Sequence, residues 1–435
     1  MLSSLAFSAV PLLLAGLQAI AVGAISPISA VGSKFFYENG TQFYIKGIAY
    51  QLTPSDPLVD TAQCKRDIAR MSELGTNAIR VYHVDPHADH KGCMSALADA
   101  GIHLFVDLDT FNTQIEQNEP HWNQTQFDHF KEVLDEFQKF DNTAGVLVGN
   151  EVLTTADGSA AAPYVLAAAR DIKAYRDKKG YREIPVGYSA ADIADLRPML
   201  QNYMACAKNA SDRLDFYSLN AYEWCGASSY EQSGYNILQK NATDYPIPIF
   251  FPRLAATPPR LAPLRTRLPS LWIEETNDYG LISYGPSVDA ATATASSIED
   301  GFTRKGTPTP VSPDFNNLKS QWATLHPTGV ALSAYRKSAS SLTAIECPAS
   351  TSGGWAVDPN SPLPTLGQTF KKGSDSTATG KNSKATNVNS SGSASASATK
   401  EGTAHFVTVG SPVTERLLAG SLVLSGLLGA VAIWL

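Results

Sequence analysis

The run GVLVGNEV, residues 145–152, ends an apolar segment with an amide and a carboxylate, Asn150 and Glu151. Val146 to Val148 have the pattern of a buried strand, and a charged Glu is costly to bury beside such a strand unless it is paired or used. In a barrel of alternating strands and helices, catalytic side chains lie at the carboxyl ends of the strands. A carboxylate there can donate or accept a proton. The other interpretation of Glu151 is a solvated loop residue or a structural ion pair.

Other predicted strands also end in polar or aromatic side chains: Tyr50, Tyr82, Asp109, Asp192, Asn220, Tyr222 and Glu223. Carboxylates, amides and rings around one site suit a carbohydrate, because rings cover apolar sugar faces and polar groups bond the hydroxyls. Tyr82 and Tyr222 are equally compatible with barrel packing, and Asp192 with Arg197 alternatively forms a surface ion pair of little energetic worth. No His or Cys cluster has metal-ligand spacing, so the sequence predicts no metal site.

These residues need a scaffold in which strands and helices alternate. Seven strand candidates cover residues 43–50, 77–84, 103–109, 145–152, 184–192, 214–224 and 247–251. Helical patterns between them include 60–75, 93–101, 123–140 and 162–180. Because no glycine-rich dinucleotide fingerprint follows the first strand, the alternation favours a (β/α)8 TIM barrel over a doubly wound sheet. The eighth strand is not visible in the sequence.

The two ends of the 435-residue chain carry targeting features. Residues 1–24 are apolar and end in Ala-Val-Gly-Ala, which predicts a signal peptide. Residues 373–404 consist mainly of Ser, Thr, Ala, Gly and Lys, which predicts a flexible stalk. Residues 405–435 end in an uncharged apolar tail, and small residues precede them; this order favours a GPI-attachment propeptide over an ordinary membrane-spanning helix. The globular domain is therefore expected at 30–365.

Composition agrees with a secreted protein. Glycosylation sequons occur at Asn39, Asn123, Asn209, Asn241 and Asn389. The net charge of −7 and the pI of 5.6 argue against a nucleic-acid partner. The five cysteines are Cys64, Cys93, Cys206, Cys225 and Cys347. In an oxidising compartment this odd count leaves one of them without an intramolecular partner.

The chain resembles the fungal GPI-anchored β-1,3-glucanosyltransferases of glycoside hydrolase family 72. The resemblance rests on the stretches FFYENGTQFYIKGIAYQ, DPLVDTAQCKRDI, LGTNAIRVYHVDP, DNTAGVLVGNEV, DFYSLNAYEWCG and EETNDYGLISYG, which cover most of residues 35–289 in order. It implies a (β/α)8 barrel that cleaves β-1,3-glucan internally and joins the new reducing end to another glucan chain, without a cofactor. The implied subfamily lacks a cysteine-rich carbohydrate-binding domain. The implied partners are donor and acceptor glucan chains and, through a GPI anchor, the extracellular face of the plasma membrane at the cell wall.

The resemblance also implies roles for individual residues. Glu151 is expected to be the general acid/base of a retaining mechanism, and Asn150 a neighbouring sugar contact. The other implied donor- or acceptor-site positions are Tyr82, Asp109, Asp192, Arg197 and Tyr222. The implied disulfides are Cys64–Cys93 and Cys206–Cys347, which leave Cys225 unpaired.

A retaining mechanism needs a second carboxylate as nucleophile, and this sequence lacks it at the expected place. The family carries it in a Ser-Glu-Tyr-Gly-Cys-Asn stretch directly after a strand such as IPIFF, but residues 252–272 contain no Asp, Glu or Cys here. A one-base shift of GGC-TGC-AAC-ACC, which encodes Gly-Cys-Asn-Thr, gives Ala-Ala-Thr-Pro, the sequence of residues 255–258. A shifted reading frame or mis-splicing is one explanation, and a divergent insertion is the other. We expect the strand 7–8 region of the barrel to be disrupted at 252–272.

No nearby glutamate is expected to replace this nucleophile. Alternation along its strand points Glu223 away from the face of Tyr222, and Glu274 and Glu275 match family positions beyond the eighth strand. Two alternative functions stay open, a catalytically inactive glucan-binding wall protein and an endo-β-1,3-glucanase. Hydrolysis and transfer share the glycosyl-enzyme intermediate and differ in whether water or a sugar accepts the glycosyl group.

Overall fold

A computed structural model describes residues 25–51, 56–225, 229, 231–232, 234–257, 271–273, 280–288, 295, 297–299, 301–339, 345–351 and 354–370, with the backbone alone at 222–225, 252–257 and 338–339. The predicted signal peptide, stalk and GPI propeptide lie outside these residues, as does the sequon at Asn389. Within the described ranges, every helix is too short or too polar to span a bilayer.

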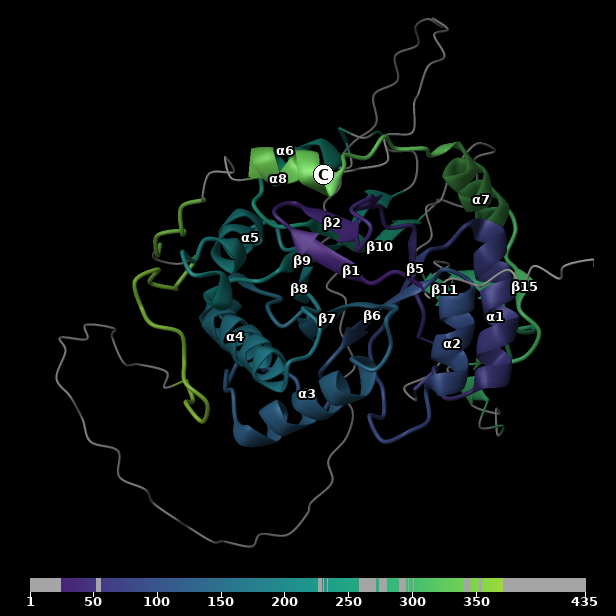
Figure 1. The fold of residues 1–435 in the computed structure, drawn as a ribbon, viewed down its shortest axis with the longest axis horizontal. Helices are drawn as coiled ribbons and strands as arrows, with labels where there is room; N and C mark the ends of the chain where they lie inside the picture. Colours follow the sequence, from purple (N-terminus) through teal and green to yellow (C-terminus); the bar gives the residue numbers. More distant parts are fainter. Residues whose placement is uncertain are drawn as a thin grey trace, which may run out of the picture. The chain divides into compact units, whose positions relative to one another are not determined.

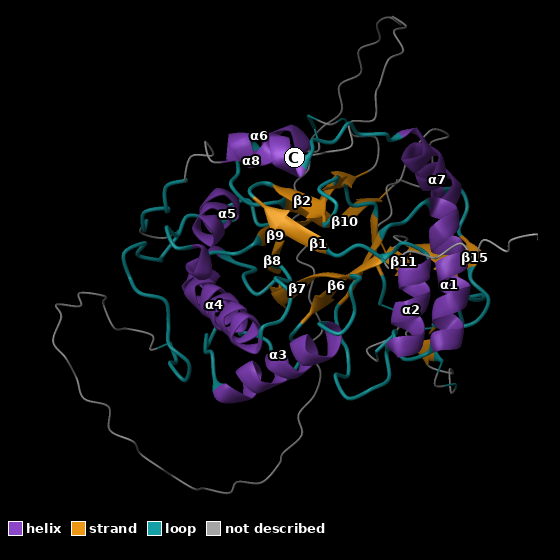
Figure 2. Cartoon of the chain, viewed as in Figure 1, coloured by secondary structure: helices purple, strands orange, loops and turns teal. Residues whose placement is uncertain are grey.

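Parallel strands alternate with helices from residue 47 to residue 257 (Figures 1 and 2). The strands are β4 (Gly47–Ala49), β5 (Ala78–Val81), β6 (His103–Asp107), β7 (Thr143–Asn150), β8 (Val186–Ala191), β9 (Phe216–Cys225) and β10 (Ile249–Thr257). The helices between them are α1 (Thr61–Leu74), α2 (Lys91–Asp99), α3 (Gln124–Phe137), α4 (Ala162–Lys179), α5 (Arg197–Ala205) and α6 (Tyr235–Ala242). Each strand pairs in parallel with the next along the chain, which confirms the predicted α/β barrel class.

The expected first strand, residues 43–50, is wrong in extent. Phe43 belongs to a separate antiparallel sheet of β1 (Ile28–Val31), β2 (Lys34–Tyr37) and β3 (Gln42–Phe43), and the barrel begins only at Gly47. Apolar residues on both sides of Tyr44 to Lys46 made two short strands look like one. The small sheet has a packing role, because its Phe35 joins an aromatic cluster inside the barrel.

This aromatic cluster shows how the sheet curves. The ring of Phe105 on β6 lies 5.6 Å from that of Phe216 on β9 and 5.2 Å from that of Phe250 on β10, between ring centroids. Phe35 lies within 6.1 Å of all three rings. Strands β6 and β9 are separated by two others in the sheet, so their side chains can meet only across the concave interior. The cluster fills the barrel on the side where β9 and β10 begin.

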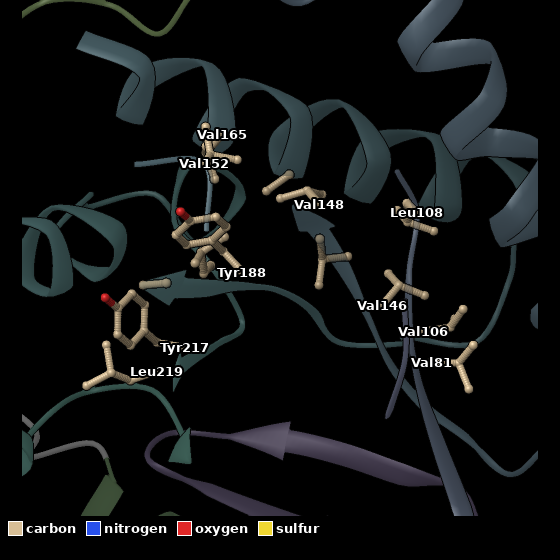
Figure 3. Packing of buried hydrophobic residues seen from close by; sticks show 14 of the residues in the cluster. Val81, Val106, Leu108, Val146, Val148, Val152, Val165, Tyr188, Tyr217 and Leu219 are labelled. Carbon is tan, nitrogen blue, oxygen red and sulfur yellow. The ribbon is translucent and has the colours of Figure 1, made fainter. Parts of the chain in front are cut away.

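The opposite face of the strands packs under the helices. Figure 3 shows alternate residues of neighbouring strands, Val81, Val106 and Val146 among them, in one layer of buried aliphatic side chains. Val165 of α4 lies close to Val152 in the same layer. Tyr188 and Tyr217 belong to the same layer as these aliphatic residues, and the residues between them along each strand face the interior, which is the period of two that a barrel requires.

The helix ends follow the chemistry that the sequence indicates. Gly75 and Gly180 close α1 and α4 in the left-handed conformation, at φ of 81° and 69°, which glycine adopts without steric cost. At the start of α3, Asn123 and Gln126 form a reciprocal capping box. Asn39 and Asn209 among the predicted sequons are exposed, and Asn123 and Asn241 are partly exposed.

The region after β10 differs in two ways from the expectation. Residues 252–257 continue β10 as a strand parallel to β9, although with register shifts between Phe250 and Arg253 and between Leu254 and Ala256. The eighth strand, which is not visible in the sequence, is represented by β11 (Leu271–Ile273), which pairs in parallel with β4. Residues 258–270 lie outside the described part. In the hydrogen-bonded order β10 stands at one edge of the sheet, although it also lies near β4.

The remaining elements extend the β11 side of the sheet. β12 (Gly280–Ser283) pairs with β11, and β15 (Thr309–Pro310) pairs antiparallel with β12. A two-stranded sheet of β13 (Ile298–Glu299) and β14 (Phe302–Thr303), with helices α7 (Asp314–Thr324) and α8 (Leu332–Ala339), completes the described elements. Two 3₁₀ turns occupy Ala156–Ala161 and Ala210–Asp212.

Both implied disulfides are present. Cys64–Cys93 joins α1 to α2, and Cys206–Cys347 joins the end of α5 to a segment 141 residues later in the chain. Such cross-links stabilise mainly by restricting the unfolded chain, and more so for long loops. The side chain of Cys225 lies outside the described part.

A buried histidine connects three parts of the barrel. His90, fully buried at the start of α2, lies 2.7 Å from Asp56 through Nε2 and 3.0 Å from Glu136 of α3 through Nδ1. Asp56 also accepts the backbone N–H of Asp85, and Glu136 also pairs with Lys139. Burial lowers the pKa of His90, but hydrogen bonds to Asp56 and Glu136 and their charges raise it more, so this pKa stands above its ordinary value.

We expect this contact to make folding stability pH-dependent. Because the folded pKa of His90 is raised, its contribution is fully present below the ordinary value of 6.5 and is lost as pH rises through the folded pKa. His90→Gln should therefore cost more free energy of unfolding near pH ~5.5 than near pH ~9, as measured by denaturant titration. His87→Gln is the control, because the side chain of His87 is 74% exposed. An equal cost of His90→Gln at both pH values would contradict this role.

Candidate active site

A buried arginine crosses the interior at the carboxyl ends of the strands. Arg80 of β5, 3% exposed, donates from Nε and Nη2 to the two carboxylate oxygens of Asp107 on β6, at 2.9 and 2.6 Å. Its Nη1 donates to Ser189 Oγ on β8 at 2.7 Å, and Nη2 also donates to Asn150 Oδ1 on β7 at 3.0 Å. One guanidinium therefore connects four strands in a fixed geometry.

The predicted acid/base residue lies at the edge of this network. Asn220 of β9, 1% exposed, donates from Nδ2 to Glu151 Oε1 at 2.5 Å and to Asn150 Oδ1 at 3.0 Å. Ser189 Oγ donates to Asn220 Oδ1 at 3.1 Å and so fixes the orientation of the amide. Glu151 is half-buried directly after β7, at the strand end where the sequence places it. Because Asn220 occupies Oε1, Oε2 is the oxygen that remains to carry a proton.

A local irregularity of β7 aims Asn150 and Glu151 into the barrel. The pairing of β7 with β8 shifts register between Leu147 and Asn150. The side chain of Val148 packs in the outer layer. A Cβ atom added to Gly149 would point to the same layer, because it would meet Val152 and Tyr188. Glu151 then adopts φ of 51°, a left-handed conformation that costs a non-glycine residue on the order of 1 kcal/mol or more. Bulges and such residues re-aim side chains beside functional sites.

Two aspartates on β6 and just after it differ in charge state. Asp107 is held as a carboxylate by the two hydrogen bonds from Arg80. Burial and, to a lesser extent, the negative charge of Asp107 raise the pKa of Asp109 to about 8, while Arg80 opposes the shift. Asp109 therefore keeps its proton at neutral pH and presents a neutral carboxyl group, which can donate a hydrogen bond.

The structure brings most of the predicted site residues to the same ends of neighbouring strands. Asn150 and Glu151 belong to the Arg80 network. The guanidinium carbon of Arg80 lies over the ring of Tyr82, 4.5 Å from the ring centroid. Asp109 follows two residues after Asp107 and is 7% exposed. The side chain of Tyr222 lies outside the described part, although its backbone belongs to β9.

Asp192 and Arg197 form an ion pair, but it is not the surface pair that was the alternative. Their side chains are only 7% and 10% exposed, at the end of β8 and the start of α5. Tyr50 has a structural environment instead: its hydroxyl donates to Asp67 Oδ2 on α1 at 2.8 Å, and it is 1% exposed. The end of β4 therefore contributes Gln51, which accepts the backbone N–H groups of Tyr82 and His83.

The sequence analysis did not identify Arg80, Asp107 or Ser189 as site residues. Arg80 and Tyr82 are two positions apart, as are Asp107 and Asp109, so each pair shares one face of its strand. An arginine and an aspartate inside two otherwise apolar strands were the signal, because charges at such positions must be paired. No group of three His, Cys, Asp or Glu residues in the part of the chain that the structure describes could hold a metal ion.

A parallel barrel whose strand ends gather an acid, two amides and a buried Arg–Asp pair is the arrangement of a barrel glycoside hydrolase. The sequence profile of the glucanosyltransferases, glycoside hydrolase family 72, matches residues 17–257. This chain therefore belongs to that glucanosyltransferase family. The match ends within the 252–272 segment that lacks carboxylates.

Individual relatives agree. Protein EPD1 of Candida maltosa is 39% identical over 350 residues, which are 75% of this chain and 60% of that protein. A 1,3-beta-glucanosyltransferase of Arthroderma benhamiae is 36% identical over 348 residues, which are 74% of this chain and 60% of that protein. This chain thus spans about three fifths of their length. The structure of Gas2 of Saccharomyces cerevisiae with laminaritriose and laminaritetraose is similar, with 34% identity, a TM-score of 0.67, and 79% and 77% of the two chains covered.

We expect Arg80→Lys to destabilise the fold by about 3 kcal/mol, because lysine keeps the buried charge but cannot bond Asp107, Ser189 and Asn150 together. The measurement is the free energy of unfolding in denaturant. The matched control is Arg70→Lys, because Arg70 pairs with Glu73 at 2.9 Å on the surface with 39% of its side chain exposed. This control should change stability by less than about 0.5 kcal/mol. Equal losses in the two variants would show that the interior network carries no special stability.

Proposed function

We propose that this protein acts on β-1,3-glucan as a retaining glucanosyltransferase of the cell wall, with Glu151 as general acid/base. The observation that carries the proposal is the Glu151 carboxylate at the end of β7, oriented by Asn220 and bounded by the Arg80 network. Family membership and the laminari-oligosaccharides bound by Gas2 support β-1,3-glucan as the substrate class. Asn150, Tyr82, Asp109, Asp192, Arg197 and Tyr222 are the proposed sugar-binding residues.

The proposed reaction has two steps, and Glu151 transfers a proton in each of them. Glu151 gives its proton to the glycosidic oxygen as a second carboxylate attacks the anomeric carbon, so the C–O bond breaks and a glycosyl ester forms. Glu151, now ionised, removes a proton from the hydroxyl of the acceptor glucan, whose oxygen displaces the ester and restores the glycosidic bond. Water in place of the acceptor would give hydrolysis.

The described aspartates near Glu151 are poor candidates for the attacking carboxylate. Both oxygens of Asp107 are engaged by Arg80, and Asp109 is protonated below about pH 8. Segment 252–272, where the family has its nucleophile, contains neither Asp nor Glu. This absence favours a second candidate function for the chain as written: it binds glucan without turning it over. Residues 274–279, which include Glu274 and Glu275, and the side chain of Glu223 lie outside the described part.

Three versions of the chain test the proposal: the chain as written, one with the family segment Ser-Glu-Tyr-Gly-Cys-Asn restored after residue 251, and the restored chain with Glu151→Gln. Each is incubated with reduced laminari-oligosaccharides, and product lengths are measured by chromatography. We expect products longer than the substrate from the restored chain alone, unaffected by EDTA. Glu151→Gln keeps the shape but loses the transferable proton, so activity should fall by on the order of a hundredfold or more.

The matched control is Glu38→Gln in the restored chain, because Glu38 is exposed. Thiol titration under denaturing conditions should find one free thiol in the written chain and none in the restored one, where Cys225 regains its partner. Transfer by the written chain at a comparable rate would show that another carboxylate is the nucleophile. Only shortened products from the restored chain would identify a glucanase, and an EDTA-sensitive rate would refute the two-carboxylate mechanism.

We further propose that the protein is anchored by GPI at the outer face of the plasma membrane, with residues 1–24 removed and 405–435 replaced by the anchor. The apolar tail 417–435 and the small residues 402–404 support this. Phosphatidylinositol-specific phospholipase C should release the full chain, expressed in a fungal host, from the membrane fraction. The control variant without residues 405–435 should appear in the medium untreated. Protein that only detergent releases would indicate an ordinary membrane-spanning helix instead.

A further inference from the structure

One aromatic ring is the most exposed of the large apolar side chains in the described part of the chain. Phe111, on the loop after β6 and two residues beyond Asp109, is 67% exposed. Scattered exposed apolar residues are normal on proteins and carry no function by themselves. Phe111 differs from such scattered residues in two ways. It lies at the carboxyl end of the barrel, and another side chain packs against its ring.

A compact turn holds the backbone of Phe111. Thr110 N donates to Thr113 Oγ1 at 2.9 Å, Thr113 N donates to Thr110 O at 3.0 Å, and Asn112 N donates to Thr110 Oγ1 at 3.3 Å. The ring packs against the imidazole of His83, with 4.3 Å between centroids and 43° between planes. One face of Phe111 is therefore covered by protein.

His83 connects the Phe111 ring, on the loop after β6, to the ends of β4 and β5. Its backbone N–H donates to Gln51 beyond β4, and it directly follows Tyr82 after β5. Burial lowers the pKa of His83, so the imidazole is neutral at neutral pH and packs against Phe111 without a charge. The support for Phe111 is thus continuous with the residues around Asp107 and Arg80.

We propose that the outer face of Phe111 is a stacking platform for one glucosyl unit of a bound β-1,3-glucan chain. The apolar C–H face of a pyranose ring can cover an aromatic face, and a pre-mounted ring loses little conformational freedom on binding. The platform stands on β4–β6, whereas Glu151 is oriented from β7–β9, so the stacked unit is not the one whose linkage Glu151 protonates. This inference rests on the proposed function and adds a determinant of chain-length preference to it.

Binding, rather than turnover, tests the platform in the chain as written. Calorimetric titration with laminari-oligosaccharides from three to seven glucosyl units compares the wild type with Phe111→Ala and Phe111→Trp. Phe111→Ala should weaken binding of the long oligosaccharides by about 5- to 20-fold and of the shortest ones much less. Phe111→Trp, which keeps an aromatic face, should bind as well as the wild type or more tightly.

The matched control is Phe370→Ala, which removes another exposed phenylalanine, 41% exposed and outside the strand-end loops. Its affinities should equal those of the wild type, and thermal unfolding of all variants checks that they are folded. Unchanged binding of the long oligosaccharides by Phe111→Ala, or an equal loss in Phe370→Ala, would overturn the platform and leave the proposed function intact. A wild type that binds no laminari-oligosaccharide of any length would overturn both.

Discussion

The buried guanidinium of Arg80 is the constraint on which the site depends. A charge that is 3% exposed is tolerated only where its donors are satisfied, and Arg80 finds its acceptors on β6, β7 and β8. Satisfying them fixes the spacing of four strands and leaves Asn150 and Ser189 oriented towards Asn220. The orientation of Glu151 is therefore a consequence of how one buried cation is neutralised, two strands away in the sheet.

Part of the site could be predicted from the sequence and part could not, because some of its geometry depends on pairing between strands. Alternation of apolar runs and helical patterns correctly predicted seven parallel strands, and strand ends correctly placed Asn150 and Glu151. Strict alternation cannot predict the register shift between Leu147 and Asn150 or the left-handed φ of Glu151, because both depend on pairing with β8. Tyr50 likewise resembled a site residue until Asp67 on α1 proved to hold its hydroxyl.

The errors in the fold share one physical origin. Whether a short segment forms a strand depends on its neighbours in the sheet more than on its own composition. Residues 43–50 are therefore divided between two sheets. Leu271–Ile273 pairs with β4 although its sequence has no strong strand pattern. Residues 252–257 continue β10 for the same reason: β9 offers free hydrogen-bonding groups, and backbone pairing does not require a particular side chain. The two register shifts there show where the sequence fits the strand poorly.

The proposed nucleophile and the Arg80 network belong to different strands. Their separation determines which parts of the site remain when the nucleophile is absent. The Arg80 network spans β5 to β9, and the hydrogen bonds to Glu151 in the described part of the chain come from Ser189 on β8 and Asn220 on β9. The two register shifts of the segment that lacks carboxylates lie on β10, beyond the last strand of the network. In the proposed mechanism, loss of the carboxylate after residue 251 therefore removes the group that would attack the anomeric carbon but leaves Glu151, the proposed proton carrier, and its supports in place. The proposed mechanism thus assigns proton delivery and nucleophilic attack to different parts of the barrel, and on that proposal a defect confined to one of them leaves a site that can still bind the sugar.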